Sequence, residues 1–411
     1  MTFNSSFEKI FKSIFPKRMK KSMVKKKFIG LIFLPIFLVS MLFPFNLKAK
    51  ELFSRTAKNG LKEYLSEICQ WVESNPVNAD NHSSILMAAG LVRTLLAGFK
   101  LTGKKQEYRN TALEWCDLFS SQQHLVKTAQ KNIGGLWLNG VNRGNLDLTE
   151  SNLAAVALAC GYKYANKERK KIYLQVLEHY GRFLVEGSLV NPLRTDLAGN
   201  NSWVIRKGLH RGAFGTGYVN GKASIMASTA STASGSLFFS QLYKITKNRA
   251  YKEQSVAALK WILNNRKATG EIPSFVEGKP LSKKSFEVIS YCAEAFQGAH
   301  YLLNDKKMVR WLLTELDPTI RWLLRSQNNQ GLWGLDVEER YSSGIVSLLA
   351  WFYLNAETDE SIPSVLEPAW QVWLHPVHSQ SFGILMEKIP TGLVGLTIAE
   401  MIRPGSTYGR K

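Results

Sequence analysis

The chain has 411 residues, with 53 Lys and Arg against 32 Asp and Glu, so its formal net charge is +21. Hydrophobic residues make up 45% and charged residues 21%, which excludes a wholly disordered, collagen-like or fibrous chain. Four cysteines in this length exclude a disulfide-dense scaffold. Length alone predicts two or three domains.

The first 50 residues have the character of a targeting segment. They hold eleven Lys and Arg and a single acid, and an uncharged apolar run spans residues 28–45. A basic region followed by an apolar core is typical of a secretory signal, although this run is close to the roughly 20 residues of a membrane helix. We therefore expect residues 1–50 to be a signal peptide or a membrane anchor.

The remaining body, residues 51–411, carries 42 basic and 31 acidic residues. With such a leader we expect the body to be exported: periplasmic, secreted, or anchored to the membrane only through residues 28–45. Export argues against a nucleic-acid partner, despite the basic composition. The excess positive charge instead favours an anionic substrate.

The body is predicted to be almost wholly helical, because apolar residues recur at spacings of three and four and no strand-like alternation is sustained. The second helix of each predicted pair is small and apolar on every side, which predicts an inner, buried ring inside an outer ring of first helices. A period of about 60 residues indicates a repeat architecture and one domain. The six predicted pairs are 52–72 with 83–101, 106–122 with 148–165, 168–186 with 223–246, 251–265 with 282–303, 306–327 with 338–355, and 362–374 with 382–402.

A short motif recurs between the helices of a pair, as Gly134-Gly135-Leu136-Trp137 and as Gln330-Gly331-Leu332-Trp333. With it, the chain resembles the (α/α)6 toroid, the all-α architecture of six-hairpin glycosidases, several polysaccharide lyases, sugar epimerases and terpenoid-cyclase-like proteins. Residues 326–333 and 341–344 are similar to the helical domain of uronyl C5-epimerases. The Asp-rich motif of class II terpene cyclases is absent, which argues against that branch. The resemblance implies a central shaft, with a cleft built by the loops that enter the inner helices.

Two of those loops, 123–147 and 187–222, are long enough to suggest a function. Polysaccharide lyases of this architecture commonly use Asn or His with Tyr to neutralise a uronate carboxyl and to move the proton at C5. By that resemblance the candidates are Asn201, His210 and Tyr218. Alternatively, the polar side chains of the second loop serve only its own hydrogen bonds.

Substrate-binding candidates lie in the same connections. An indole can stack on the apolar face of a sugar ring, and a guanidinium can bind a carboxylate with two hydrogen bonds. The tryptophans of the recurring motif can equally plug the turn of their repeat. The candidates are Trp137, Trp203, Arg206, Arg211 and Trp333.

A hydrolase would instead need a protonated acid and an ionised carboxylate about 5–10 Å apart. Asp147 and Asp336 stand where loops enter inner helices, and they are the candidate catalytic acids. Their spacing to Glu150 and Glu339 fits a capping box equally well, so a structural role is the alternative. Further acids near such junctions are Glu150, Asp196, Glu271 and Glu339.

The sequence contains few patterns that would indicate a metal or an organic cofactor, and we expect neither. His375 and His378 form the closest histidine pair, with no carboxylate or cysteine nearby, and no phosphate-binding or dinucleotide-binding motif stands in a fitting context. The cysteines, at wide spacing within predicted helices, are expected to be small buried residues: Cys69, Cys116, Cys160 and Cys292.

These observations predict an exported carbohydrate-active enzyme that acts by lysis or hydrolysis on a polysaccharide or oligosaccharide, and the charge favours one that contains uronic acid. Two alternatives remain open. One is an enzyme similar to the uronyl epimerases. The other is a non-catalytic glycan-binding or assembly protein of the envelope, because the sequence offers no convincing catalytic pair.

Overall fold

The computed structural model describes the helical body and parts of its connections. The chain divides into two compact units, Met1–Glu51 and Leu52–Lys411, and every described residue belongs to the second. The predictions for residues 1–50 therefore lie outside the described residues. The described residues are 52, 55–74, 85–103, 105–127, 132–137, 145–185, 202–219, 222–276, 278–281, 285–334, 339–356, 361–374 and 391–408.

Twelve helices alternate between an outer and an inner position in this part of the chain. The outer helices are α3 (Arg55–Ser74), α5 (Gln106–Ser121), α7 (Lys167–Val185), α9 (Arg249–Asn264), α11 (Lys306–Ser326) and α13 (Ser361–Leu374). The inner helices are α4 (Ile85–Leu101), α6 (Leu148–Tyr162), α8 (Thr229–Thr246), α10 (Ser285–Leu303), α12 (Glu339–Asn355) and α15 (Thr391–Ile402).

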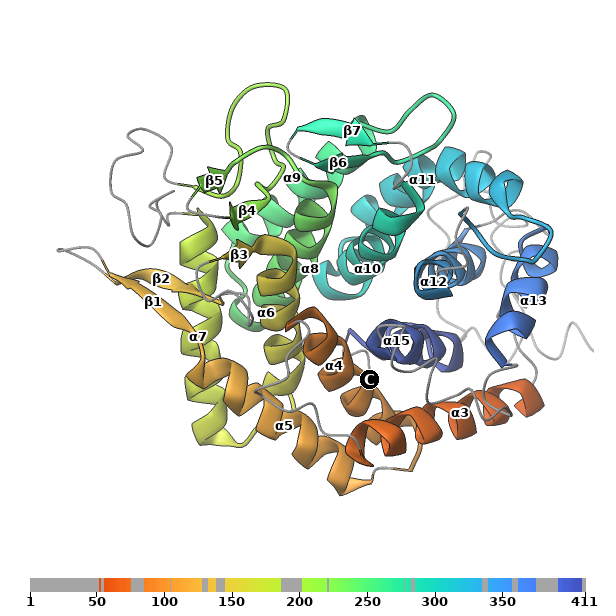
Figure 1. Ribbon diagram of the computed structural model, residues 1–411, viewed down its shortest axis with the longest axis horizontal. Coiled ribbons are helices and arrows are strands. Elements are labelled where there is room, and N and C mark those ends of the chain that lie inside the picture. Colours follow the sequence, from red (N-terminus) through yellow and green to blue (C-terminus); the bar gives the residue numbers. More distant parts are fainter. Residues whose placement is uncertain are drawn as a thin grey trace, which may run out of the picture. The chain divides into compact units, whose positions relative to one another are not determined.

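The inner helices form a closed ring. Each packs on the next in the order α4, α6, α8, α10, α12, α15, and α15 returns to α4 (Figure 1). The outer helices surround them, so the prediction of an all-α (α/α)6 toroid with six hairpins is confirmed.

Small residues allow the inner helices to approach closely. A Cβ at Gly344 of α12 would collide with Ser290 of α10, and one at Gly395 of α15 would collide with Thr94 of α4. The ring therefore depends on glycine in at least two of its seams. Buried polar groups are paired across another seam, because the side-chain amide of Asn152 in α6 donates to the Ser231 carbonyl in α8 at 3.0 Å.

Short hairpins occupy three of the connections, which the sequence had predicted to be free of strands. They are β1 (His124–Lys127) with β2 (Asn132–Leu136), β3 (Leu146–Asp147) with β4 (Gly217–Val219) and β5 (Lys222–Ser224), and β6 (Ser274–Val276) with β7 (Lys279–Leu281). Strands of two to five residues are too short to show alternation. The inner helix was predicted to begin at residue 223, but Ala223 and Ser224 belong to β5 and α8 begins only at Thr229.

All three hairpins lie in connections that lead from an outer helix to the next inner helix. They lie at the end of the ring where α6, α8 and α10 begin, and the β1–β2 hairpin projects outward beside α7, apart from β6–β7 (Figure 1). No described helix is both long enough and apolar enough to cross a membrane.

Candidate functional site

The rim of the ring is built where the long connections meet the first turn of α6. In the antiparallel pair of β3 and β4, Asp147 lies opposite Gly217 and Leu146 lies opposite Tyr218. The backbone N–H of Leu148 also donates to the Thr216 carbonyl at 3.1 Å. The sheet therefore brings the end of the second long loop beside the start of α6.

Gly217 makes this junction possible. Its φ of 144° lies in a region that other residues rarely adopt, and a Cβ there would collide with the Leu146 carbonyl oxygen. The backbone of Tyr218 is thereby fixed next to Leu146. The side chain of Tyr218 lies outside the described residues.

Hydrogen bonds extend the rim from α6 to the neighbouring inner helices. The hydroxyls of Thr149 and Ser231 lie 3.1 Å apart and join the first turns of α6 and α8. The Thr229 hydroxyl donates to the Pro273 carbonyl at 2.9 Å and accepts from the Phe275 N–H at 2.8 Å. The rim from α6 to the β6–β7 hairpin is therefore one connected structure.

Asp147 caps α6, as one of the two alternatives predicted. Its Oδ1 accepts the backbone N–H of Thr149 at 2.7 Å and that of Glu150 at 3.2 Å. Burial raises the pKa of the Asp147 carboxyl, and the two N–H bonds oppose this effect. Asp147 therefore has a structural role as the N-cap of α6.

Glu150, for which the sequence allowed both a catalytic and a capping role, is the stronger functional candidate. Its side chain is partly buried in the first turn of α6, and its Oε2 is buried with no hydrogen-bond partner in the described part of the chain. Burial and then the nearby Asp147 charge raise the pKa of the Glu150 carboxyl to about 7. A carboxyl that is half protonated at neutral pH can donate or accept a proton in catalysis.

His210, the histidine of the second long loop, lies away from Asp147 and Glu150. His210 Nδ1 accepts from the Trp261 indole N–H at 3.3 Å, and the His210 ring packs edge-on against Trp261 and Phe275, with centroids 5.9 and 5.8 Å away. Because Trp261 belongs to α9, this segment lies over an outer helix. None of these contacts brings His210 to Asp147 or Glu150.

The two predicted arginines of the loop also face outward. Arg206 is exposed and its Nη2 donates to the Val185 carbonyl at the end of α7, while Arg211 is exposed. Of the remaining predicted catalytic residues, Asn201 and Asp336 lie outside the described residues.

The prediction that loop tryptophans are sugar platforms is wrong for this structure. Trp137 and Trp333 are each 2% exposed and Trp203 is 1% exposed, so none offers a ring face to a ligand. The Trp137 indole donates to the Phe119 carbonyl at 2.7 Å, and the Trp333 indole donates to the Leu323 carbonyl at 2.8 Å.

Those two carbonyls belong to the last turns of the outer helices α5 and α11. The carbonyl groups of a last turn have no hydrogen-bond partner within their own helix. The recurring motif therefore seals the end of an outer helix. Trp203 is instead held by packing, with its ring centroid 6.0 Å from that of Phe183.

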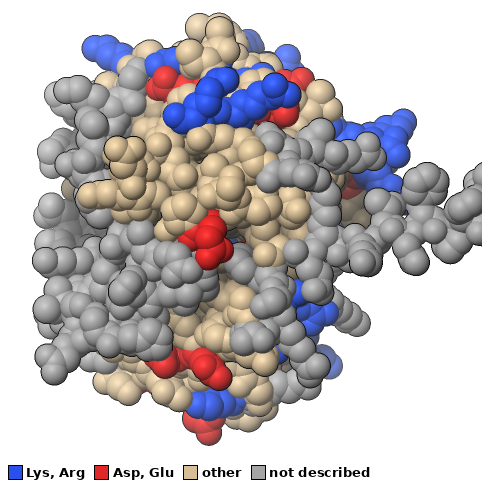
Figure 2. Space-filling view, turned by 90° about the vertical axis from the view of Figure 1, so that its right-hand side faces the viewer, with Lys and Arg blue, Asp and Glu red and all other residues tan. Residues whose placement is uncertain are grey.

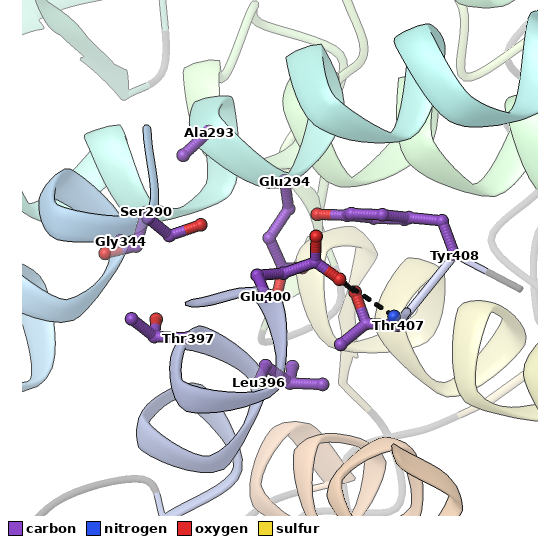
Figure 3. Close-up of a pocket in the computed structure, with 10 residues that line it drawn as sticks. Ser290, Ala293, Glu294, Gly344, Leu396, Thr397, Glu400, Thr407 and Tyr408 are labelled. Atoms are coloured by element: carbon purple, nitrogen blue, oxygen red, sulfur yellow. Dashed lines mark hydrogen bonds between the residues drawn. The ribbon is translucent and has the colours of Figure 1, made fainter. Parts of the chain in front are cut away.

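Charged residues also lie inside the ring, although no sequence pattern predicted them there. Glu294 of α10 forms an ion pair with Arg93 of α4 at 2.8 Å. Glu400 of α15 accepts the backbone N–H and the hydroxyl of Thr407 at 2.8 and 2.6 Å. Figure 3 shows Glu294, Glu400 and Tyr408 directed toward one another.

The pocket among these side chains is about 10 Å³, enough for a water molecule and not for a sugar. Burial raises the pKa of Glu400 and that of Tyr408. We therefore assign this cluster to the packing of the ring and the C-terminal segment, residues 403–408.

The other acids and the thiols have structural surroundings. Glu271 Oε1 accepts from the Lys267 ammonium at 2.9 Å and from the Ser285 hydroxyl at 2.5 Å, which ties a connection to the start of α10. All four cysteines are free, and Cys160 is partly buried while the others are fully buried. Within the described residues, no three His, Cys, Asp or Glu side chains gather closely enough to hold a metal ion. Asp196, His375 and His378 lie outside those residues, as does the side chain of Glu339.

The described surface is mixed in charge on the side shown in Figure 2. Basic and acidic groups lie next to one another near the upper and lower edges, and an acidic group stands among uncharged residues near the centre. Among the described residues drawn in Figure 2, the basic groups do not form one continuous field that would by itself select an anionic polymer.

No family model and no curated protein sequence matches the chain. Solved structures match over most of its length. A polysaccharide lyase has a TM-score of 0.58 at 14% identity, covering 84% of this chain and 97% of its own. The cellobiose 2-epimerase of Spirochaeta thermophila has a TM-score of 0.60 at 12% identity, covering 85% and 98%.

An inactive variant of an α-1,6-mannanase from a Salegentibacter species, in complex with α-1,6-mannotriose, has a TM-score of 0.55 at 12% identity, covering 84% and 98%. The chain therefore shares the (α/α)6-toroid fold of these structures. These neighbours are carbohydrate-active enzymes of three different kinds, and the likeness identifies no single family among them.

Proposed function

We propose that the chain is a glycoside hydrolase in which Glu150 donates a proton to the glycosidic oxygen. The observation that carries this proposal is a carboxyl in the first turn of an inner helix, with a pKa of about 7 and one oxygen without a partner among the described residues. Carbohydrate-active enzymes as structural neighbours support it. The mannanase among these neighbours also supports the proposal, because its inactive variant carries replacements of two carboxylate residues, both aspartates.

The reaction needs a proton donor on the leaving oxygen while the bond to the anomeric carbon breaks. At neutral pH a large fraction of Glu150 is protonated and can supply that proton. The second carboxylate must lie several ångströms away, to attack directly or to activate water. Asp147 is committed to the cap of α6, so Asp336, before the first turn of α12, remains the predicted partner.

A second candidate is β-elimination on a polymer that contains uronic acid. The place of Tyr218 in β4, beside the start of α6, favours it, because a tyrosine and a protonated carboxyl would then share one rim. The polysaccharide lyase among the structural neighbours and the excess of basic residues in the body support this alternative. Export through residues 1–50 is part of both proposals, since a polymeric glycan outside the cell requires it.

The test is an incubation of the full-length chain, in a detergent that contains no sugar, with neutral and uronic-acid polysaccharides. New reducing ends without an unsaturated product indicate a hydrolase, and ultraviolet absorbance of an unsaturated uronide indicates a lyase. Altered sugar stereochemistry without chain cleavage indicates an epimerase. Binding without any product supports the non-catalytic alternative.

Two variants assign the proton donor. Glu150→Gln removes it and should abolish product formation, whereas Glu253→Gln removes the same charge from an exposed position on α9 and should not. Full activity of Glu150→Gln would contradict the proposal.

A further inference from the structure

A second hollow opens at the opposite end of the ring, where α4, α6 and α8 end. Its volume is about 380 Å³, which falls in the lower part of the roughly 300–1,000 Å³ range of ligand pockets. Its lining includes Tyr162 at the last residue of α6, whereas Glu150 lies in the first turn of that helix. Twelve residues of α-helix separate the two by about 18 Å. The hollow is therefore distinct from the rim.

Arg93 lines this hollow from the middle of α4. Its side chain is 3% exposed, and its Nη1 is bound to Glu294 at 2.8 Å. Its Nε and Nη2 are buried and have no hydrogen-bond partner among the described residues. These two N–H groups point along one edge of the guanidinium, which is the arrangement that binds a carboxylate or a phosphate with two parallel hydrogen bonds.

The surroundings of Arg93 provide no strong acceptor for that edge. The Cys160 thiol is close enough to Arg93 for a weak hydrogen bond, but a thiol sulfur is a poor acceptor. It also accepts from the Gln241 side-chain amide at 3.6 Å and donates to the Thr407 carbonyl at 3.7 Å. No carboxylate is among the described residues that line the hollow. Glu294 is already paired with the other edge of Arg93.

Three lysines line the same hollow: Lys163, Lys170 and Lys244. The positive ends of two lie near tyrosine rings, since Lys163 Nζ is 5.4 Å from the Tyr164 centroid and Lys170 Nζ is 5.8 Å from the Tyr162 centroid. The local field is positive: burial, followed by the charges of Lys163 and Arg403, lowers the pKa of nearby Lys100 to about 8.

Favourable interaction with helix ends explains the position of only some of the basic residues around the hollow. Lys244 stands in the last turn of α8, where a cation favours the helix dipole. Lys170, however, lies in the first turn of α7, where a cation is unfavourable, and Arg93 lies in the middle of a helix. The ion pair with Glu294 accounts for one edge of Arg93. An anion in the hollow would account for its other edge and for the position of Lys170.

We propose that this hollow binds a molecule of monosaccharide size that bears a carboxylate or a phosphate. The oxyanion accepts from Nε and Nη2 of Arg93, and Lys170 and Lys244 offset its remaining charge. The tyrosine rings of the wall supply apolar surface for the rest of the molecule. The site is independent of the proposed role of Glu150.

Calorimetric titration of the full-length chain tests the proposal. The probes are glucuronate and glucose 6-phosphate, which separate the two kinds of anion, with glucose as the neutral match. We expect one or both anions to bind and glucose not to bind. The Lys170→Gln/Lys244→Gln variant should weaken the affinity at least about tenfold. Lys260→Gln/Lys306→Gln, which removes two exposed lysines from outer helices, should leave it unchanged.

Arg93→Lys tests the guanidinium edge, because it keeps a positive charge beside Glu294 but loses the two parallel donors. We expect a similar loss of affinity, with thermal unfolding measured alongside to confirm that the variant folds. If it does not fold, the lysine variants still decide the question.

Three results would overturn the proposal: no binding at about 10 mM of either anion, an equal loss in the control variant, or loss of binding in Glu150→Gln. The last result would place the ligand at the rim. An active Glu150→Gln enzyme would contradict the proposed function while leaving this binding result intact.

Discussion

The raised pKa of Glu150 makes a quantitative prediction about stability. The folded state holds the proton of this carboxyl up to about pH 7, whereas the ordinary value is 4.5. Because the folded pKa is the higher one, the folded state binds more protons between these values. The associated stability is fully present below the unfolded pKa and is lost as the pH rises through 7.

The size of the effect follows from the difference between the two pKa values. At 1.36 kcal/mol per pKa unit, the shift costs the folded state about 3 kcal/mol once the carboxyl is ionised. Glu150→Gln cannot ionise, so it should not lose this stability. As the pH rises from about 5 to about 8, the free energy of unfolding of the variant should therefore increase by up to about 3 kcal/mol relative to that of the wild type.

Urea denaturation at a series of pH values measures this difference directly as a free energy of unfolding. Glu253→Gln, an exposed glutamate on α9, controls for the loss of one charge. A difference between wild type and Glu150→Gln that stays constant over the whole pH range would refute the reasoning. It would mean that Glu150 is already ionised at neutral pH and is no proton donor.

Three further predictions concern the rim, the loop and the buried thiols. Gly217→Ala should destabilise the chain by about 1–3 kcal/mol in chemical denaturation and impair turnover, because its Cβ would collide with a β3 carbonyl. The control is Gly60→Ala, which has open space around it and should remain stable. His210→Phe should leave turnover unchanged while losing about 1 kcal/mol with its hydrogen bond to Trp261, and loss of turnover would restore the predicted lyase role. Burial raises the pKa of the three fully buried thiols, Cys69, Cys116 and Cys292. A thiol reagent at pH 8 should therefore modify them only after unfolding, and rapid labelling of the folded chain would contradict their burial.

The ring could be predicted from the sequence because its signal is repeated. The second helices are apolar on all sides, and such a helix can only be buried. Most predicted helix bounds lie within three residues of the observed ones. Two starts depart further. Helix α8 begins only at Thr229, because Ser228 caps it by accepting the backbone N–H of Ser231. The predicted start of the last helix, residues 382–390, lies outside the described residues.

The site could be predicted only in part, because its members come from different hairpins. Asp147 and Glu150 were found at a loop-to-helix junction, but their spacing fitted a cap and a catalytic role equally well. Only the buried surroundings of Glu150, and the N–H bonds already made by Asp147, separate the two roles.

The tryptophans show the opposite error. Their place in connecting loops suggested open platforms for sugars. The direction in which an indole points is not encoded in local spacing, and the structure turns Trp137 and Trp333 inward to helix-end carbonyls.

The most direct test of the proposed function is the pH dependence of kcat/KM on whichever glycan the chain cleaves. For the wild type we predict a loss of kcat/KM above about pH 7, as the Glu150 proton is lost. Glu150→Gln should lower kcat/KM by about 10²–10⁴-fold. A wild-type profile that is flat through neutral pH, together with an active Glu150→Gln variant, would contradict the account.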